Sequence, residues 1–294
     1  MENHNTVITP EVREKLSRLR HIALDMDGTI YLGSRLFPFT PGFLEDMRSA
    51  GIGYSFLTNN PTRSVADYIR KLEGMGIQAG EDNMYTTSLA AIDWIKETYP
   101  SARRLFLLGT PSMVTQFEKA GFVSCADDPA DVPDVLVVAF DPTLTYERLC
   151  RAAWWASQGI PYVATNPDRV CPTDKPTVLV DCGSLQKCIE HATSRKPDIV
   201  LGKPDPTMLR GIMHRHGLKP DEIAMVGDRI YTDTAMAHNA GAVGVLVLSG
   251  ETTLATAEAV ARDAATNPAP EFYPPDFIVR DIRELGDMIL EARN

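Results

Sequence analysis

Short apolar runs alternate with longer stretches of helical spacing over almost the whole chain. The apolar runs predict strands, at His21–Leu24, Tyr54–Leu57, Arg104–Leu108, Val135–Phe140, Tyr162–Ala164, Ile199–Leu201, Ile223–Val226, Val243–Leu248 and Phe277–Val279. Strands that are separated by amphipathic helices are typical of repeated βα units. The pattern therefore predicts an α/β fold around a mainly parallel sheet.

The intervening stretches predict helices. Between Ser64 and Met75, apolar residues recur at Val65, Ile69 and Leu72 on one helical face, and glycines follow where the helix would end. The same reasoning predicts further helices at Ser88–Thr98, Ser112–Ala120, Tyr146–Gln158, Ser184–Thr193, Pro206–His216 and Thr232–Ala240.

The length and net charge of the chain limit the classes of protein to which it could belong. The chain has 294 residues, enough for two domains of ordinary size. Its 39 acidic and 29 basic residues give a formal net charge of −10, which repels nucleic acid and anionic membranes. The apolar runs are far shorter than the ~20 residues that span a bilayer, and Met1–Asn5 lacks the pattern of a secretory signal. We therefore expect a cytoplasmic protein with neither nucleic acid nor membrane as a partner.

The first candidate for chemistry is the segment Ile22–Thr29, in which an apolar run leads directly into two carboxylates. Strand periodicity places Asp25 and Asp27 on one face. Two neighbouring carboxylates repel each other unless a cation lies between them or one is protonated. The segment therefore predicts a metal or proton-transfer site, although Asp27 and Gly28 also form a common turn dipeptide.

A second candidate follows the strand Tyr54–Leu57. Thr58, Asn59 and Asn60 offer a hydroxyl, two amides and backbone N–H groups, which together suit an anion. The alternative interpretation is an ordinary helix cap, because capping residues are of the same types.

Two further candidates also come directly after strands. Lys203 follows Ile199–Leu201, and Asp228 follows Ile223–Val226, with Asp233 five residues later. Singly, a lysine is most often a solvated surface charge, and an aspartate often begins a helix. Together, all four candidates fall at the carboxyl ends of predicted parallel strands, where open α/β sheets bind their ligands. The coincidence predicts a single ligand site.

In this order, the four segments resemble the motifs of the haloacid dehalogenase (HAD) superfamily. Those motifs are Asp-x-Asp-x-Thr, a strand-end Thr or Ser, a Lys, and Gly-Asp-x-x-x-x-Asp. The most similar branch is class IIA, the NagD-like phosphatases, which the chain matches further at Leu57–Asn60, Ala164–Asp168, Gly202–Pro204, Val226–Asp228 and Leu248–Thr253. The resemblance extends from about Asp25 to the end of the chain.

The resemblance implies a Rossmann-like core, mainly parallel and doubly wound, with a second α/β domain inserted as a cap. In this chain the first part of the core would be 1–82, the cap 83–197 and the second part of the core 198–294. The resemblance also allows a homodimer formed through the cap.

The resemblance also implies a role for each site residue. Asp25 would attack phosphorus and form an aspartyl-phosphate, and Asp27 would protonate the leaving oxygen and later activate water. Mg²⁺ would be held by the Asp25 carboxylate, the Asp27 backbone carbonyl and Asp228, with Asp233 behind them. The phosphoryl oxygens would be held by Thr58, Asn59, Asn60 and Lys203.

Charge supports a metal independently of the resemblance. With Asp27 protonated, the charges of Asp25, Asp228 and a phosphate dianion nearly balance those of Mg²⁺ and Lys203, and helix N-termini can offset the rest. Without the metal, the negative charges of Asp25 and Asp228 would repel the phosphate dianion that the site has to bind. The sequence therefore predicts metal dependence.

The chain is accordingly expected to be an Mg²⁺-dependent phosphomonoesterase. Its substrate would be a small phosphorylated metabolite such as a nucleotide monophosphate, a sugar phosphate or pyridoxal phosphate, with 4-nitrophenyl phosphate as a generic substrate. A dehalogenase would need the nucleophile alone, without Asp27 and Asp228. A phosphotransferase, or a phospho-receiver module that uses the same aspartate, is a further alternative, but receivers are far shorter and lack an inserted cap.

The irregular segment Asn166–Thr177 is the candidate for substrate discrimination. It carries Asn166 and Asp168 within an otherwise regular βα sequence, and such loops are often functional. A cap loop could contact the leaving group, which the phosphate-binding core does not sense. The alternative is a solvent-exposed turn shaped by Pro167 and Pro172.

Overall fold

The computed structural model describes residues 9–171 and 176–294. The described chain forms two compact units. The first comprises Met1–Leu57, Lys71–Met84 and Leu209–Asn294, and the second comprises Thr58–Arg70 and Tyr85–Met208. The segment Met1–Asn5, on which the prediction about a secretory signal depends, and Pro172 both lie outside the described residues.

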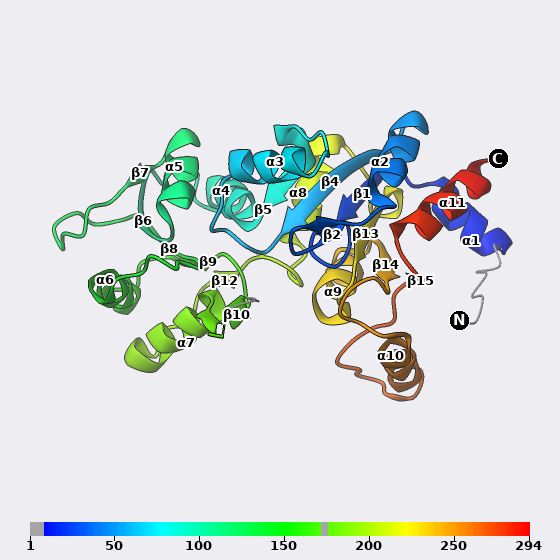
Figure 1. Ribbon diagram of the computed structural model, residues 1–294. Coiled ribbons are helices and arrows are strands. Elements are labelled where there is room, and N and C mark those ends of the chain that lie inside the picture. Colours follow the sequence, from blue (N-terminus) through cyan, green and yellow to red (C-terminus); the bar gives the residue numbers. More distant parts are fainter. Residues whose placement is uncertain (1–8, 172–175) are drawn as a thin grey trace. The chain divides into compact units, whose positions relative to one another are not determined.

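A six-stranded sheet forms the centre of the first unit (Figure 1). Its order is β15 (Phe277–Val279), β14 (Val243–Val247), β13 (Ile223–Gly227), β1 (His21–Leu24), β4 (Gly53–Thr58) and β5 (Met84–Thr86). β1 runs parallel to both neighbours, with His21 opposite Ile223 and Gly53. Every residue of β1, β13 and β14 is buried, as expected for a parallel sheet that is covered on both faces.

Helices and one small hairpin complete the first unit. The helices are α1 (Pro10–Ser17), α2 (Thr40–Ser49), α9 (Ala235–Ala240), α10 (Leu254–Thr266) and α11 (Ile282–Arg293), with α3 (Val65–Gly74) and α8 (Thr207–His216) shared between the two units. α11 packs against α1 and α2, and the red and blue ribbons of α11 and α1 lie side by side in Figure 1. The hairpin pairs β2 (Tyr31–Leu32) with β3 (Arg35–Leu36).

The second unit has its own parallel sheet. The order is β12 (Ile199–Val200), β9 (Tyr162–Ala164), β8 (Val135–Val138), β6 (Arg104–Leu108) and β7 (Val123–Ser124). Along β6, Leu105 and Leu107 pack in one apolar cluster with α4 (Thr87–Thr98) and α5 (Pro111–Lys119), whereas Phe106 and Leu108 pack in another with α6 (Tyr146–Ser157) and α7 (Cys182–Thr193). This alternation shows that helices cover both faces.

In a short antiparallel pair, β10 (Val170–Cys171) lies in the segment predicted to be an irregular loop and β11 (Leu179–Val180) follows that segment. Two-residue strands of this kind carry too few positions for a periodicity to be recognised.

The predicted fold class is confirmed, because both larger sheets are mainly parallel and helices alternate with the strands. Each predicted strand is present, although Val135–Phe140 is shorter in the structure and Tyr54–Leu57 is longer. The predicted helix Thr232–Ala240 is instead a π-helical turn, Ile230–Thr234, followed by α9. The helices α1, α2, α10 and α11 were not predicted.

The predicted division into core, cap and core stays a prediction, since the compact units group Thr58–Arg70 with the residues up to Met208. Among the helices formed by residues 9–171 and 176–294, none is both long and apolar enough to cross a membrane.

His21 lies at the start of β1, and its burial leads us to expect that the free energy of unfolding decreases in acid. Its Nε2 lies 2.9 Å from the Ser55 hydroxyl, and its ring stacks on His216 with centroids 4.5 Å apart. Burial, and secondly the charge of His216, lower the pKa of His21 from 6.5 to about 4. Protonation therefore favours the unfolded chain, so stability is complete above pH 6.5 and falls as the pH decreases toward 4, by about 3 kcal/mol in all.

The measurement is the free energy of unfolding against pH for the wild type and for His21→Gln, which cannot titrate. We expect the wild-type curve to fall more steeply than the variant curve between pH 6.5 and pH 4. Parallel curves over this range would show that His21 does not carry the effect.

Candidate active site

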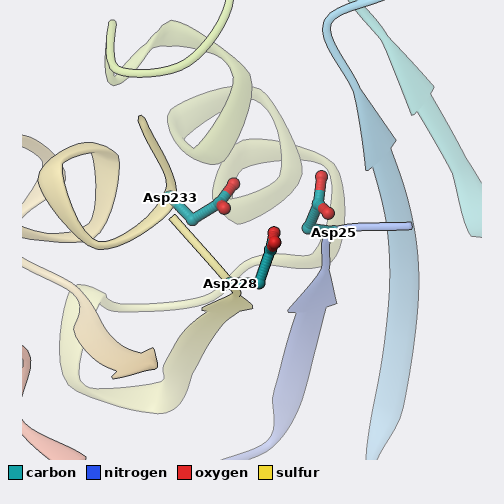
Figure 2. Close-up of side chains that lie close together, drawn as sticks. All are labelled: Asp25, Asp228 and Asp233. Atoms are coloured by element: carbon teal, nitrogen blue, oxygen red, sulfur yellow. The ribbon is translucent and has the colours of Figure 1, made fainter. Parts of the chain in front are cut away.

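Three carboxylates meet at the carboxyl end of the sheet in the first unit (Figure 2). Asp25 follows β1, Asp228 follows β13, and Asp233 belongs to the π-helical turn; one oxygen from each lies within 4.8 Å of the others. The first two come together because Leu24 is opposite Val226 in the parallel register, so the two strands end at the same level. Asp228 and Asp233 are buried and Asp25 is partly exposed.

The loop that follows β14 holds Asp228 in place. The backbone N–H of Glu251 donates to Asp228 Oδ2 at 2.7 Å, and the N–H of Thr252 donates to its backbone carbonyl at 3.1 Å. At Gly250 an added Cβ would lie 2.5 Å from Asp228 Cγ, and at Gly28 it would lie 2.5 Å from Oδ2. Only glycine allows the backbone so close to this carboxylate from both sides.

This contact gives a prediction for Gly250→Ala. The added methyl group must displace the Asp228 carboxylate, and disturbing the groups that hold a ligand typically weakens metal binding by about 10- to 100-fold. If the cluster holds a divalent cation, the half-saturating concentration of that cation should rise at least about ten-fold, as measured by cation binding. Gly74→Ala is the control, because a Cβ there meets no atom within 4 Å. Equal half-saturating cation concentrations in both variants would contradict the role of this loop.

Asp233 is held by its own turn. The backbone N–H of Arg229 donates to Asp233 Oδ2 at 3.1 Å, and Gly227 leaves room for the side chain, since a Cβ there would lie 2.5 Å from Asp233 Cβ. The family resemblance implies that Asp233 lies behind the metal ligands. In the structure its carboxylate lies in the same cluster as the other two, and its direct or indirect role stays a prediction.

Asp27 lies in the turn after β1 and is exposed. Because β1 ends at Leu24, Asp25 and Asp27 lie beyond the strand rather than on its face, so the strand-periodicity argument does not describe them. Gly28 takes a positive φ of 89° and donates its N–H to the Tyr31 carbonyl at 2.7 Å, which closes the turn. The exposed carboxyl can exchange protons with solvent.

Arg229 is a cation beside the cluster that the sequence analysis missed. Its Nε lies 2.9 Å from Glu251 Oε2, and the Tyr231 hydroxyl donates to Glu251 Oε1 at 2.6 Å. Burial opposes the charged form of Arg229, but Tyr231 and the nearby carboxylates outweigh it and raise the pKa of the guanidinium. The sequence feature that could have identified Arg229 is its position directly after Asp228.

The remaining predicted residues lie in the second unit. The Asn59 side chain bonds to Lys203 and Asp168, and Asp168 bonds to Asn166. Lys203 is 4% exposed and Asn166 is fully buried. The burial of Asn166 argues against a direct contact with substrate, and its predicted part in discrimination stays a prediction.

Thr58 and Asn60 shape the turn after β4. The N–H of Asn60 donates to the Thr58 hydroxyl oxygen at 3.2 Å, and the Asn60 side-chain oxygen accepts from the N–H of Thr62 at 3.0 Å. Both are thus engaged in the local turn but do not cap α3, which begins at Val65 and whose Asp67 N–H donates to the Ser64 hydroxyl oxygen at 3.2 Å. Their predicted contact with phosphate stays a prediction.

The chain is similar to known hydrolases, in agreement with a carboxylate-based active site. Residues 22–123 match the family described as haloacid dehalogenase-like hydrolase, and residues 200–285 match a second HAD-hydrolase-like family. The acid sugar phosphatase of Staphylococcus aureus is 31% identical over 79% of this chain and 87% of its own.

Two solved structures extend the likeness to the fold. The 4-nitrophenylphosphatase of Thermotoga maritima is 37% identical, covers 93% of this chain and 98% of its own, and has a TM-score of 0.83. A putative NagD protein is 40% identical, covers 80% of this chain and 91% of its own, and has a TM-score of 0.75.

Fold, carboxylate cluster and relatives together define a hydrolase of phosphate esters. The chain belongs to the haloacid dehalogenase superfamily, in its class IIA branch of NagD-like phosphatases.

Proposed function

We propose that this phosphatase is an Mg²⁺-dependent phosphomonoesterase that hydrolyses a small phosphorylated metabolite through an aspartyl-phosphate on Asp25. The observation that carries the proposal is the carboxylate cluster of Asp25, Asp228 and Asp233, with oxygens within 4.8 Å of one another. Carboxylates are established nucleophiles in phosphoryl transfer.

The donor set fits a hard divalent cation. Carboxylate and carbonyl oxygens are the ligands that Mg²⁺ prefers, and buried like charges repel unless a cation compensates them. Asp25, Asp228 and the Asp27 carbonyl would hold the ion, with Asp233 beside them. When bound, it neutralises charge that develops on the phosphoryl oxygens.

Two aspartates carry the reaction in this proposal. A carboxylate oxygen of Asp25 forms a bond to phosphorus while the ester P–O bond breaks, and the Asp27 carboxyl gives its proton to the leaving oxygen. Asp27 then takes a proton from water, whose oxygen attacks phosphorus and releases Asp25 and phosphate. The exposure of Asp27 supports this role, because the attacking water must reach its carboxylate.

We further propose that Thr58, Asn59, Asn60 and Lys203 contribute to binding the phosphoryl group. The buried position of Lys203 supports this, because an ammonium in a protein interior interacts strongly with an anion. A homodimer through the cap and a cytoplasmic location stay predictions.

Substrate class is proposed from the relatives. One is named an acid sugar phosphatase and another a 4-nitrophenylphosphatase, which supports sugar phosphates as substrates and 4-nitrophenyl phosphate as a generic one. The test is phosphate release from a panel of sugar phosphates, nucleotide monophosphates and pyridoxal phosphate, with and without Mg²⁺. Turnover that continues in the presence of a chelator would contradict metal dependence.

The panel also separates the alternatives. A phospho-receiver module would label Asp25 from an acyl-phosphate donor and release no phosphate from monoesters. A phosphotransferase would pass the group to an added alcohol in preference to water.

A further inference from the structure

The side chain of Asn59 is joined to the backbone of Lys203 on both sides of that residue. The N–H of Lys203 donates to Asn59 Oδ1 at 2.8 Å, and Asn59 Nδ2 donates to the Lys203 carbonyl at 3.1 Å. Gly202 allows this approach, because it has a positive φ of 81° and a Cβ there would lie 3.0 Å from Asn59 Oδ1. Asn59 thus fixes the backbone from which the lysine side chain extends.

The second hydrogen of Asn59 Nδ2 goes to Asp168. Asp168 Oδ2 accepts from Asn59 Nδ2 at 2.9 Å and from Asn166 Nδ2 at 2.9 Å. Asn166 is itself anchored, because its Nδ2 also donates to Asp181 Oδ1 at 2.9 Å and its Oδ1 accepts from the Thr165 hydroxyl at 2.9 Å. Asp168 is therefore held at the same oxygen by a second amide besides that of Asn59.

This arrangement allows only one orientation of the Asn59 amide. Asp168 Oδ2 accepts from two amide nitrogens, and a carboxylate has no hydrogen to donate, so the Asn59 amide nitrogen must face it. If the amide were reversed, Asn59 Oδ1 would face the carboxylate, and Nδ2 would face the N–H of Lys203. Both contacts would be repulsive, and the hydrogen bonds to Lys203 would be lost.

We propose that Asp168 is a positioning residue for phosphate binding, which acts through the Asn59 amide to hold Lys203. The inference rests on the proposed function, in which Lys203 binds the phosphoryl group. It differs from discrimination between leaving groups, because a misplaced Lys203 affects every phosphate ester, including the smallest.

The test compares Asp168→Ala with Asp168→Asn. In Asp168→Ala the acceptor is lost, and we expect kcat/KM to fall about ten-fold or more for sugar phosphates and for 4-nitrophenyl phosphate alike. Competitive inhibition by inorganic phosphate should weaken by a similar factor, while the half-saturating Mg²⁺ concentration stays unchanged. Asp168→Asn keeps an oxygen that can accept both hydrogen bonds and should recover most of the loss.

A double-variant cycle tests the route through the lysine. If Asp168 acts through Lys203, Asp168→Ala should have little further effect in a Lys203→Met background.

Asn59→Asp provides a second variant. It retains the shape of the side chain but cannot donate to either partner, and it should reproduce the weakened phosphate inhibition. Asp128→Ala is the matched control, because Asp128 is an exposed aspartate of the same unit whose side chain accepts from the N–H of Ala130 at 2.8 Å, within its own turn.

Several results would overturn the inference while leaving the phosphatase intact. These are a loss confined to larger substrates, Asp168→Asn as impaired as Asp168→Ala, equal effects of Asp168→Ala with and without Lys203, or unchanged phosphate inhibition in Asn59→Asp. A wild-type protein that releases no phosphate from any ester would instead contradict the proposed function, and the inference with it.

Discussion

Asp25→Asn is expected to lose nearly all turnover, by about 10³-fold or more, while the chain stays folded. The amide is almost isosteric with the carboxylate but cannot form the phosphoryl intermediate. The measurement is kcat for 4-nitrophenyl phosphate at saturating Mg²⁺, with thermal unfolding as the test of folding. Higher Mg²⁺ should not restore activity, because the missing group is the nucleophile.

Asp221→Asn is the control for this variant. It makes the same chemical change at an exposed aspartate of the same unit, which is paired with Arg18 at 3.3 Å, and it should keep wild-type kcat. If Asp25→Asn keeps even about a tenth of the activity, the covalent role of Asp25 is wrong.

The second large effect separates Asp27 from Asp228. Asp27→Asn should slow turnover by about 10²- to 10⁴-fold, the usual contribution of general acid–base catalysis. It should leave the Mg²⁺ dependence unchanged, because the proposed metal contact of Asp27 is its backbone carbonyl. Asp228→Asn should instead raise the half-saturating Mg²⁺ concentration by about ten-fold or more, and excess Mg²⁺ should restore part of its activity.

Activity titrated against Mg²⁺ in the two variants decides between these roles. The same half-saturating concentration in both variants would contradict the division, and so would a rescue of Asp27→Asn by excess metal.

The parts of the site that follow buried strands could be predicted from the sequence. Asp25 and Asp228 each come directly after an apolar run, and parallel strands bring their ends to one edge of the sheet. The local pattern and one general rule of α/β folds were sufficient for this pair.

The contacts between loops could not be predicted. Asn59 meets Asp168 and Lys203 across 109 and 144 residues of chain, and no periodicity relates such positions. The contacts of Gly250 and Glu251 with Asp228 could not be predicted from the local sequence pattern either. The stretch Leu248–Thr253 matches the family motifs, but that match does not indicate which residue it contacts.

One predicted helix differs from the structure because its first turn is not α-helical. The π-helical turn Ile230–Thr234 replaces the first turn of a predicted α-helix and brings Asp233 into the carboxylate cluster. Such turns are often found at functional sites, and helical periodicity does not distinguish them from an α-helix.

Mass spectrometry of Asp27→Asn, quenched during turnover of 4-nitrophenyl phosphate, tests the central claim most directly. Nitrophenolate leaves with little help from an acid, whereas the breakdown of the intermediate needs Asp27 to activate water. The account predicts that the variant accumulates one phosphoryl group per chain, on the peptide that contains Asp25, and that hydroxylamine removes it. Turnover without a covalent phosphoryl group, or with the group on another residue, would contradict it.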